Sequence, residues 1–523
     1  MYFCLKIKAL IHVLRRYDNV ELKVKVIDVR AGKRSVIINE EDAQKIGVGL
    51  NDRVKLEAGT KSSTCIVETT RSLVPKGVVG VYKDLAEALS LKDGDDVNVY
   101  YEKTPLAVEY IRKKAKGARL SEMEINEIIK DLVNNELSDL EIAEFIFAIN
   151  YVGMDLDEIR SLTLAMVNSG ERLELPGFTV DKHSIGGVPG NKVTLLIVPT
   201  VALTELYIPK TSSSAITSPS GTADTMSVLA NVKFTLSEIK EIVTKTHGCI
   251  VWGGTLNLAP ADDYMIKIES PLRINPRGLM MASVMAKKLA VNAKVIVLDL
   301  PVGKGTKLAD VSEAEKLAKD FFELGRSLGV NVRSGITYGG QPVGRAVGPA
   351  LEAREALLAL MNPAQASMSL LSKSASLAGI LLEASGVVQR GLGYDVALDM
   401  IFKGKAYEKM KQIIEAQGGN PNVKPDDLPV GSYRHVIKAE TDGYVTMVDN
   451  EAIDEIARAA GAPIDKGAGV VLYQKQGYKV NKNDPILEIY AERSSKLSEA
   501  ISVAERKNPV LVEGMLLKVY PSL

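Results

Sequence analysis

The chain has 523 residues, of which 46% are apolar and 25% charged, and this composition excludes a largely disordered protein. The 65 basic and 65 acidic residues cancel, which excludes a general nucleic-acid binder with a basic excess. The three cysteines and four histidines are scattered, so neither a disulfide framework nor a metal site is expected. No long uninterrupted apolar run occurs. We therefore expect a cytoplasmic protein that contacts no membrane.

The first hundred residues favour a β-rich domain. Residues 1–20 are expected to be a loose N-terminal extension without the pattern of a signal peptide. Within 21–103, short β-branched runs alternate with turn residues, at 23–29, 35–39, 53–56, 64–68 and 96–101. Similar stretches recur at an offset of about 43 residues, which indicates a duplicated strand–helix–strand unit in a small barrel. Because no polar groups cluster there, we expect a domain for assembly.

Residues 104–175 predict a helical domain. Capping boxes mark helix starts at Ser121 with Glu124, Ser138 with Glu141, and Asp155 with Glu158. Apolar residues between 125 and 132 recur at helical spacing.

Residues 176–417 predict a mostly parallel α/β sheet domain, because strand-like and helical stretches alternate. The strand-like runs are 192–198, 248–252 and 294–299, and the helical ones include 279–290 and 312–328. A Gly- and Pro-rich linker, 418–431, precedes a small C-terminal α+β domain, 432–523, with one expected helix. The chain is therefore predicted to be a multidomain α/β protein.

The first dense cluster of polar residues lies at 181–194. Gly186, Gly187 and Gly190 would let backbone N–H groups approach a ligand, and Lys182, with nearby hydroxyls, would favour an oxyanion such as phosphate. The spacing is not that of a Walker A loop. The alternative is a glycine-rich turn with a solvated lysine.

Two further polar segments follow. Residues 210–224 are rich in small hydroxyls and lead into a helical stretch, which suits a second oxyanion pocket; the alternative is a Ser-rich surface loop. Ser283 and Lys287 are four residues apart, so they share a helix face that could hold a polar ring edge; the alternative is a solvated face.

These motifs resemble those of a known family. Lys182-His183-Ser184-x-Gly-Gly, followed by Lys-Val-Thr194, resembles the phosphate signature of thymidine and pyrimidine-nucleoside phosphorylases, and Ala-Ser283-x-x-Ala-Lys287-Lys resembles their base-contacting helix. The resemblance covers about residues 104–523. The β-rich N-terminal domain and the Ser-Pro-x-Gly-Thr-Ala-Asp motif at 218–224 are similar to the archaeal AMP phosphorylase branch.

The resemblance implies a pentosyltransferase that phosphorolyses nucleoside 5′-monophosphates. AMP and phosphate would give adenine and ribose 1,5-bisphosphate in AMP catabolism, and CMP and UMP would also react. Inorganic phosphate would be a substrate, with no cofactor and no metal. The partners would be small molecules and further copies of the chain, in a homodimer or a larger homo-oligomer.

The resemblance also assigns roles by position. The expected phosphate ligands are Lys182, Ser184, Thr194, Ser212 and Thr222. The expected nucleotide-binding residues are Gly187, Ser213, Ser214, Ala215, Ile216, Thr217, Ser218, Thr222, Ser283, Lys287 and Lys307. Lys182, His183 and Asn275 are the expected catalytic residues, and His183 would face the base.

Two positions depart from the AMP phosphorylase pattern. Ser214 stands where the pattern has Arg, and Asn275 stands where it has the proton-donor Asp. Asn can donate a hydrogen bond but cannot give up a proton at neutral pH. These departures keep two alternatives open. One is a pyrimidine-nucleoside phosphorylase, although that enzyme's base-binding Arg falls near Ile268 here. The other is a catalytically impaired nucleotide-binding homologue.

Overall fold

The computed structural model describes residues 19–215, 218–514 and 520. The chain divides into two compact units, each described by itself below. Unit 1 comprises Met1–Ala165 and Ala261–Met280, and unit 2 comprises Met166–Pro260 and Met281–Leu523. Among the described residues, no helix has both the length and the apolar character needed to cross a membrane.

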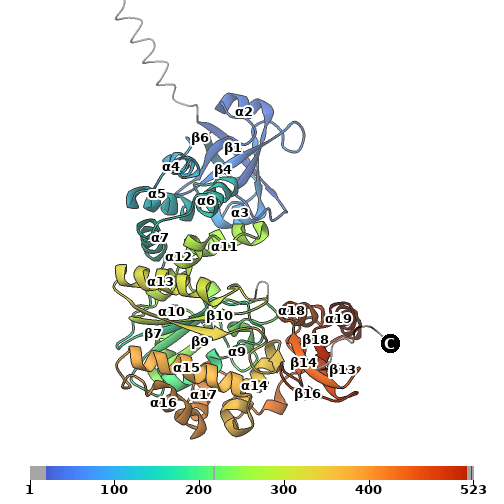
Figure 1. The fold of residues 1–523 in the computed structure, drawn as a ribbon. Coiled ribbons are helices and arrows are strands. Elements are labelled where there is room, and N and C mark those ends of the chain that lie inside the picture. Colours follow the sequence, from blue (N-terminus) through green and yellow to red (C-terminus); the bar gives the residue numbers. More distant parts are fainter. Residues whose placement is uncertain (1–18, 216–217, 515–519, 521–523) are drawn as a thin grey trace, which may run out of the picture. The chain divides into compact units, whose positions relative to one another are not determined.

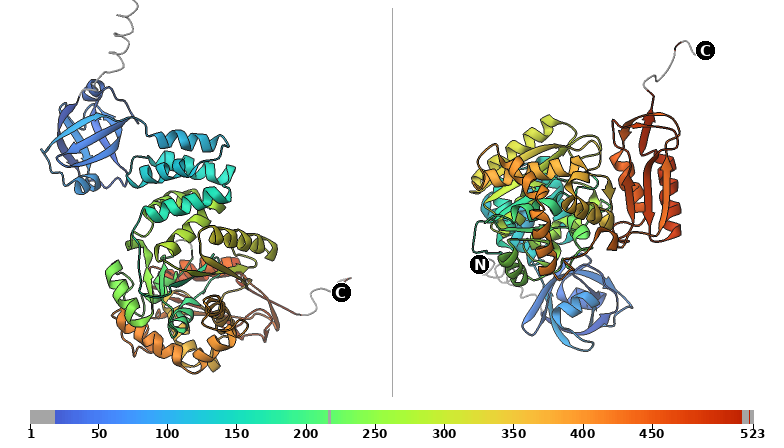
Figure 2. Two further views of the ribbon diagram at one scale, coloured as in Figure 1. Left: turned by 90° about the vertical axis from the view of Figure 1, so that its left-hand side faces the viewer. Right: turned by 90° about the horizontal axis from the view of Figure 1, so that it is seen from below.

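Unit 1 begins with a closed six-stranded barrel, shown in blue in Figures 1 and 2. Its strands, in the order β1-β5-β2-β4-β3-β6, are β1 (Val20–Ile27), β2 (Ser35–Asn39), β3 (Arg53–Ala58), β4 (Lys61–Thr70), β5 (Val78–Tyr82) and β6 (Asp96–Tyr101). Alternate side chains, such as Val36, Ile38 and Val54, fill the barrel interior, as the period of a strand requires. The expected barrel-like domain is confirmed.

The duplication within the barrel is also present. The unit β2-α2 (Glu40–Ile46)-β3 recurs as β5-α3 (Lys83–Leu89)-β6, with each element 43 residues further along the chain. Sequence reasoning did not predict β5. Gly80 interrupts its β-branched run, and an added Cβ there would lie 3.1 Å from Ile37 and from Val74.

The helical part of unit 1 packs beside the barrel (Figure 1). It consists of α4 (Leu106–Ala115), α5 (Glu122–Val133), α6 (Asp139–Val152), most of α7 (Leu156–Asn168), α11 (Pro260–Leu272) and the start of α12 (Arg277–Ala290). The three predicted capping boxes are all formed. Polar contacts join barrel and helices: Arg53 pairs with Glu141, and the Thr64 hydroxyl donates to Glu136 at 2.5 Å.

Unit 2 is built on parallel strands. β11 (Asn331–Tyr338), β10 (Val295–Val302) and β7 (Val180–Ser184) form one sheet, and β8 (Ile208–Ser212) pairs with β9 (Gly248–Trp252). A parallel bridge between Thr179 and Tyr207 links the two, which gives the strand order β11-β10-β7-β8-β9.

Helices cover both faces of this sheet (Figure 1), and a large apolar core lies beneath them. They are α8 (Thr194–Val201), α9 (Thr222–Met226), α10 (Leu236–Thr246), α13 (Val311–Ser327), α14 (Pro349–Met361), α15 (Met368–Ala384), α16 (Gly393–Phe402) and α17 (Lys405–Ala416). The expected α/β sheet is confirmed. The strand predicted at 192–198 is wrong, because α8 occupies this stretch. All eight of its residues are buried, so the run is apolar on every side and its pattern does not separate a helix from a strand.

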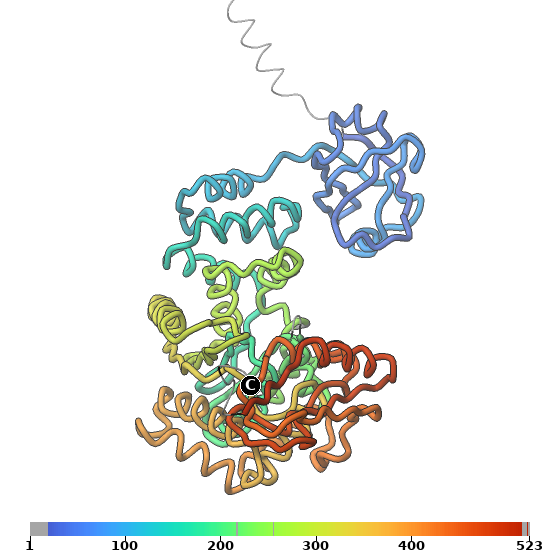
Figure 3. Tube along the Cα trace, turned by 45° about the vertical axis from the view of Figure 1, so that its right-hand side comes forward, coloured from blue at the N-terminus to red at the C-terminus, as the bar shows by residue number. Residues whose placement is uncertain are grey.

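The C-terminal domain of unit 2, red in Figure 3, packs against the α/β domain. β12 (Ala346–Val347), from the α/β domain, pairs with β15 (Gly469–Leu472), which continues to β17 (Pro485–Ala491) and β13 (Tyr433–Lys438). A second sheet contains β16 (Lys479–Val480), β14 (Gly443–Val448) and β18 (Val510–Glu513). The α+β class is confirmed, but the expectation of one helix is wrong. Both α18 (Asn450–Ala459) and α19 (Ser494–Lys507) form, each burying an apolar stripe.

Candidate active site

The predicted phosphate residues lie where parallel strands of unit 2 end. β7 ends with Lys182, His183 and Ser184, and β8 ends with Thr211 and Ser212. β10 ends at Val302, after which a short loop contains Lys307. Because the carboxyl ends of parallel strands share one edge of a sheet, these segments meet there, which is where ligands bind in such sheets.

Lys182 is buried in this edge, with 2% of its surface exposed. Its Nζ donates to the hydroxyl of Thr194, the first residue of α8, at 3.4 Å. Burial lowers the pKa of Lys182 to about 8, although Asp299 favours the charged form. The structure thus brings together two of the predicted phosphate ligands.

Ser184 belongs to a second buried network, centred on Asp299 in the middle of β10. The Ser184 hydroxyl donates to Asp299 Oδ2 at 2.8 Å, and the Asn191 amide donates to both groups at 3.0 and 3.1 Å. Thr337 donates to Asp299 at 2.6 Å, and Lys373 forms an ion pair with it at 3.0 Å. Burial alone would raise the pKa of Asp299. The positive charges of Lys373 and Lys182, together with the hydrogen bonds from Thr337 and Asn191, instead lower it. Sequence reasoning missed Asp299, which is 115 residues from Ser184.

Two further buried lysines surround Asp181, and neither was predicted. Lys288 Nζ lies 2.7 Å from Asp181 Oδ2, and Lys210 Nζ lies 3.9 Å from Asp181 Oδ1. Burial and the adjacent Lys288 lower the pKa of Lys210 well below its usual value. Burial and the same lysines also lower the pKa of half-buried His183, which favours the neutral imidazole. The sequence did hold a signal for both lysines, because Lys210 is the first residue of the hydroxyl-rich segment 210–224 and Lys288 directly follows the predicted Lys287.

Gly187 brings the first glycine-rich loop against the segment that contains Lys307. Gly187 has φ +89°, and an added Cβ would lie 2.8 Å from the Lys307 backbone nitrogen. A side chain at position 187 would therefore separate the two loops. Lys307 itself is exposed.

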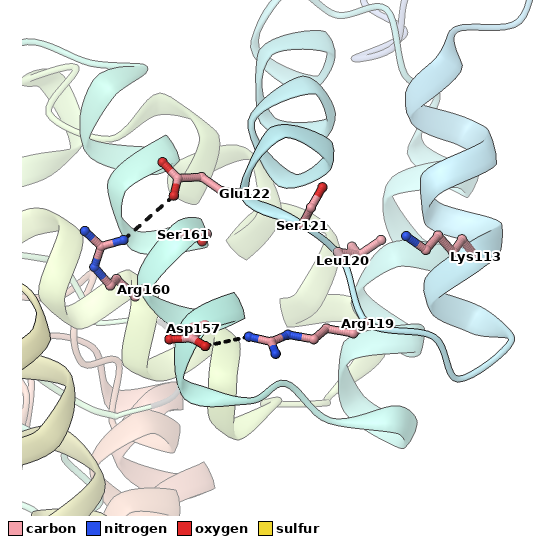
Figure 4. Close-up of a pocket in the computed structure, with 8 residues that line it drawn as sticks. All are labelled: Lys113, Arg119, Leu120, Ser121, Glu122, Asp157, Arg160 and Ser161. Atoms are coloured by element: carbon pink, nitrogen blue, oxygen red, sulfur yellow. Dashed lines mark hydrogen bonds and ion pairs between the residues drawn. The ribbon is translucent and has the colours of Figure 1, made fainter.

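A pocket in unit 1 offers a contrast to this cluster (Figure 4). It has a volume of about 520 Å³ and is lined by Lys113, Arg119, Leu120, Ser121, Glu122, Asp157, Arg160 and Ser161. Its cations have carboxylate partners: Arg119 pairs with Asp157 at 2.6 Å, and Arg160 with Glu122 at 3.8 Å. The positive charges of these arginines are therefore neutralised by neighbouring carboxylates. In unit 2, by contrast, several buried lysines lie around only two carboxylates.

Three family models match consecutive parts of the chain. Residues 108–170 match the helical bundle domain of a glycosyl transferase family, residues 177–407 match the a/b domain of that family, and residues 444–510 match the pyrimidine nucleoside phosphorylase C-terminal domain. Among solved structures, anthranilate phosphoribosyltransferase from Thermus thermophilus is similar at 17% identity and a TM-score of 0.49. That match covers 59% of this chain and 99% of the other.

Full-length relatives are more similar. The AMP phosphorylase of Thermococcus kodakarensis is 50% identical over 497 residues, 95% of this chain and 98% of its own. AMP phosphorylase 1 of Archaeoglobus fulgidus is 50% identical over 94% and 98% of the two chains, and the AMP phosphorylase of Methanosarcina mazei is 49% identical over 96% and 98%. The chain belongs to the AMP phosphorylase family. The resemblance read from the sequence motifs is confirmed at this level.

In the hydroxyl-rich segment that suggested the AMP phosphorylase branch, one carboxylate accepts hydrogen bonds from two backbone amides. Asp224 Oδ2, at the start of α9, accepts from the Ala215 amide at 2.7 Å and from the Gly221 amide at 3.0 Å. Ser212 and Ser218 donate to nearby backbone carbonyls, Ser213 and Ser214 are exposed, and Thr222 is the first residue of α9. The predicted Ile216 and Thr217 lie outside the described residues.

The remaining predicted residues lie on or before α12. Ser283 and Lys287 are half-buried on the part of this helix that belongs to unit 2, while the adjacent Lys288 reaches Asp181. Asn275, at the proton-donor position of the AMP phosphorylases, lies in unit 1, where it is exposed between α11 and α12. The roles assigned to all these residues stay predictions.

Proposed function

We propose that the chain is a pentosyltransferase that phosphorolyses AMP, giving adenine and ribose 1,5-bisphosphate. The names of its full-length relatives support this proposal, and the charge of the site is the observation that carries it. Lys182, Lys210, Lys288 and Lys373 are buried around the carboxylates of Asp181 and Asp299. Charging all four amines around two carboxylates is costly unless an anion binds, and this cost is seen in the lowered pKa values of Lys182 and Lys210. A phosphate dianion would supply the missing negative charge.

The reaction that we propose needs positioning more than acid–base chemistry. A phosphate oxygen attacks C1′ as the bond from C1′ to the adenine nitrogen breaks, through an oxocarbenium-like transition state. The proton that hydrogen phosphate loses ends on adenine. Lys182 and Thr194 would hold phosphate against C1′, and the buried ammonium group would stabilise its charge without solvent reorganisation. Asn275 would donate a hydrogen bond to the base.

The assembly and the cellular location are further parts of the proposal. We infer a homo-oligomer of at least two chains, in which the barrel supplies contacts between copies. The thiols of Cys65 and Cys249 are free and buried, which fits the reducing conditions of the cytoplasm. The chemistry calls for no cofactor beyond the substrate phosphate.

A substrate panel tests the proposal. Release of free base from AMP, CMP, UMP, adenosine and uridine is measured with and without inorganic phosphate. We expect phosphate-dependent release of adenine from AMP that exceeds release from adenosine, with slower release from CMP and UMP. Faster reaction of uridine than of any monophosphate would instead indicate a pyrimidine-nucleoside phosphorylase.

The substitutions at positions 214 and 275 favour one competing function, a nucleotide-binding homologue with impaired catalysis. Ser214 lacks the bidentate guanidinium that clamps a phosphate, and Asn275 cannot donate a proton. Calorimetric binding of AMP without base release at any phosphate concentration would establish this alternative and exclude the phosphorylase.

A further inference from the structure

The C-terminal domain contacts the loop after β10, which contains the predicted nucleotide-binding residue Lys307. Asn450, the first residue of α18, is 2% exposed, and its amide donates to the carbonyl oxygens of Lys304 at 3.0 Å and Gly339 at 2.8 Å. These carbonyls belong to the loops that follow β10 and β11. One side chain from a different domain thus links the two loops.

The loop after β10 fits closely against this asparagine. An added Cβ on Gly305 would lie 3.0 Å from the Cβ of Asn450, and one on Gly303 would lie 2.5 Å from the backbone nitrogen of Gly340. The Thr306 hydroxyl donates to the carbonyls of Gly303 and Leu308, at 2.8 and 2.7 Å, so the loop is a compact unit. Moving its contact with Asn450 would therefore move the whole segment, including Lys307.

The same domain reaches the hydroxyl-rich loop. Lys466 Nζ lies 3.3 Å from Oδ1 of Asp224, whose other oxygen accepts from the amides of Ala215 and Gly221. The Lys466 carbonyl also accepts from the amide of Ala350, at the start of α14. α18 and the segment after it are therefore joined to two separate edges of the site, although they contribute no predicted ligand.

We propose that Asn450 is a positioning residue of the active site, which holds the segment 303–307 in the conformation that presents Lys307 to the nucleotide. This role rests on the proposed function and on the nucleotide-binding role that the family resemblance assigns to Lys307. The two accepting groups are backbone carbonyls, so the interaction requires an N–H donor at position 450. Aspartate has nearly the same shape but only acceptor oxygens when ionised.

Two variants and a matched control test this role. Asn450→Asp keeps the shape and removes both donors, and Asn450→Ala removes the whole amide. Ile489→Val is the control, because Ile489 is fully buried in β17, within the apolar core of the same domain, so its loss of a methyl group destabilises the domain through a site outside the loop. All three are compared with the wild-type full-length chain.

The first readout is amide hydrogen exchange at Gly303, Thr306 and Leu308. We expect exchange at least about fivefold faster in both Asn450 variants, because loops open locally when such contacts are lost. We expect wild-type rates in Ile489→Val. Exchange in Asn450→Asp no faster than in the control would overturn the positioning role. This comparison needs no substrate, so it decides the role of Asn450 even if the wild-type chain releases no adenine and the proposed function fails.

The second readout is steady-state kinetics on AMP. We expect the KM for AMP to rise about tenfold in the Asn450 variants, the effect of about one lost hydrogen bond to a charged or buried partner. We expect kcat to stay within about threefold and the KM for phosphate within about twofold, because β7 and α8, not this loop, hold Lys182 and Thr194. Faster loop exchange together with an unchanged KM for AMP would also overturn the proposal.

Discussion

At the scale of single residues, the site depends on lysines that the fold removes from water. Lys182 is buried beside the hydroxyl of Thr194, and burial lowers its pKa to about 8. The ammonium form is therefore present at neutral pH but is lost more readily than in an exposed lysine. A bound anion favours the charged form, so anion binding and protonation of Lys182 are coupled.

This coupling predicts a pH-dependent affinity for anions. Sulfate, a dianion across the whole range, should inhibit phosphorolysis in competition with phosphate. Because the pKa of Lys182 is lowered to about 8, the neutral amine prevails above that pH, and the inhibition constant should rise about tenfold per pH unit there. It should vary little between pH 6.5 and 7.5. Initial rates at several sulfate concentrations give this profile.

The matched variant is Lys182→Met, which keeps most of the side-chain volume and has no titrating group. It should lower turnover by orders of magnitude while the chain stays folded, and the inflection near pH 8 in sulfate inhibition should disappear. A wild-type inflection that persists in this variant would assign the titration to another group, and unchanged catalytic efficiency at limiting phosphate would remove Lys182 from the phosphate site.

Asn275 carries the second prediction at this scale. If it occupies the place of a general acid, Asn275→Asp should raise the AMP rate by at least about tenfold, which is below the roughly hundred- to ten-thousand-fold of a well-placed general acid because the restored carboxyl group would be imperfectly positioned. The UMP rate should change less, because a pyrimidine leaving group is assisted at its O2, where His183 is the expected contact. Rates on both substrates are compared in the wild type and the variant.

A structural role for Asn275 predicts a different result. It is exposed and directly precedes Pro276 at the start of α12, a position typical of an asparagine in a turn. In that case Asn275→Asp should change both rates slightly and equally. Asn134→Asp, at an exposed asparagine that caps α5, is the control for an added surface charge.

At the scale of helices and strands, short sequence motifs predicted several elements correctly, whereas contacts between residues distant in the chain could not be predicted from the sequence. Capping boxes located the starts of α5 and α6, and the 43-residue offset revealed the duplicated halves of the barrel, because both signals lie within short stretches. The stretch 192–198 gave the wrong element because a fully buried helix shows no polar face. Lys288 and Asp299 were missed because their partners lie on other elements of the fold; those of Asp299 are between 38 and 115 residues away in the chain.

The cap of α9 carries a prediction at this scale. Asp224 holds the amides of both Ala215 and Gly221, and its carboxylate also pairs with Lys466. Asp224→Asn removes the charge, so we expect the loop to loosen and the KM for AMP to rise about tenfold, consistent with hydrogen bonds to charged groups of about 1.5–3 kcal/mol. The KM is measured at saturating phosphate.

The control for this change is Asp427→Asn. Asp427 caps the short turn Pro425–Asp427 by accepting from the Lys424 amide at 2.9 Å, far from either nucleotide loop in sequence. It should leave the KM for AMP unchanged. An equal effect of both substitutions would show that general destabilisation, and not the loop 215–221, accounts for the loss.

At the scale of the whole molecule, the barrel is separable from the chemistry. Its core is its own, because the buried side chains of its strands and short helices pack on one another. Its contacts with the helical part of unit 1 include polar ones, namely the pair of Arg53 with Glu141 and the bond from Thr64 to Glu136. Removing the barrel would return these carboxylates to water and would take away an apolar cluster made of the barrel's own residues. The helices should therefore stay folded without it.

This separation predicts what deletion of residues 1–103 does. We expect the remaining chain to keep its activity on AMP within about threefold, because every predicted ligand lies beyond residue 180, while its oligomeric mass falls. Light scattering coupled to size exclusion measures the mass.

Glu141→Gln in the full-length chain is the control. This substitution breaks the ion pair with Arg53, but Gln still completes the capping box with Ser138, so the oligomeric mass should not change. An unchanged mass after deletion would exclude the barrel from assembly, whereas loss of mass in Glu141→Gln would show that the barrel acts by orienting the helices that it contacts.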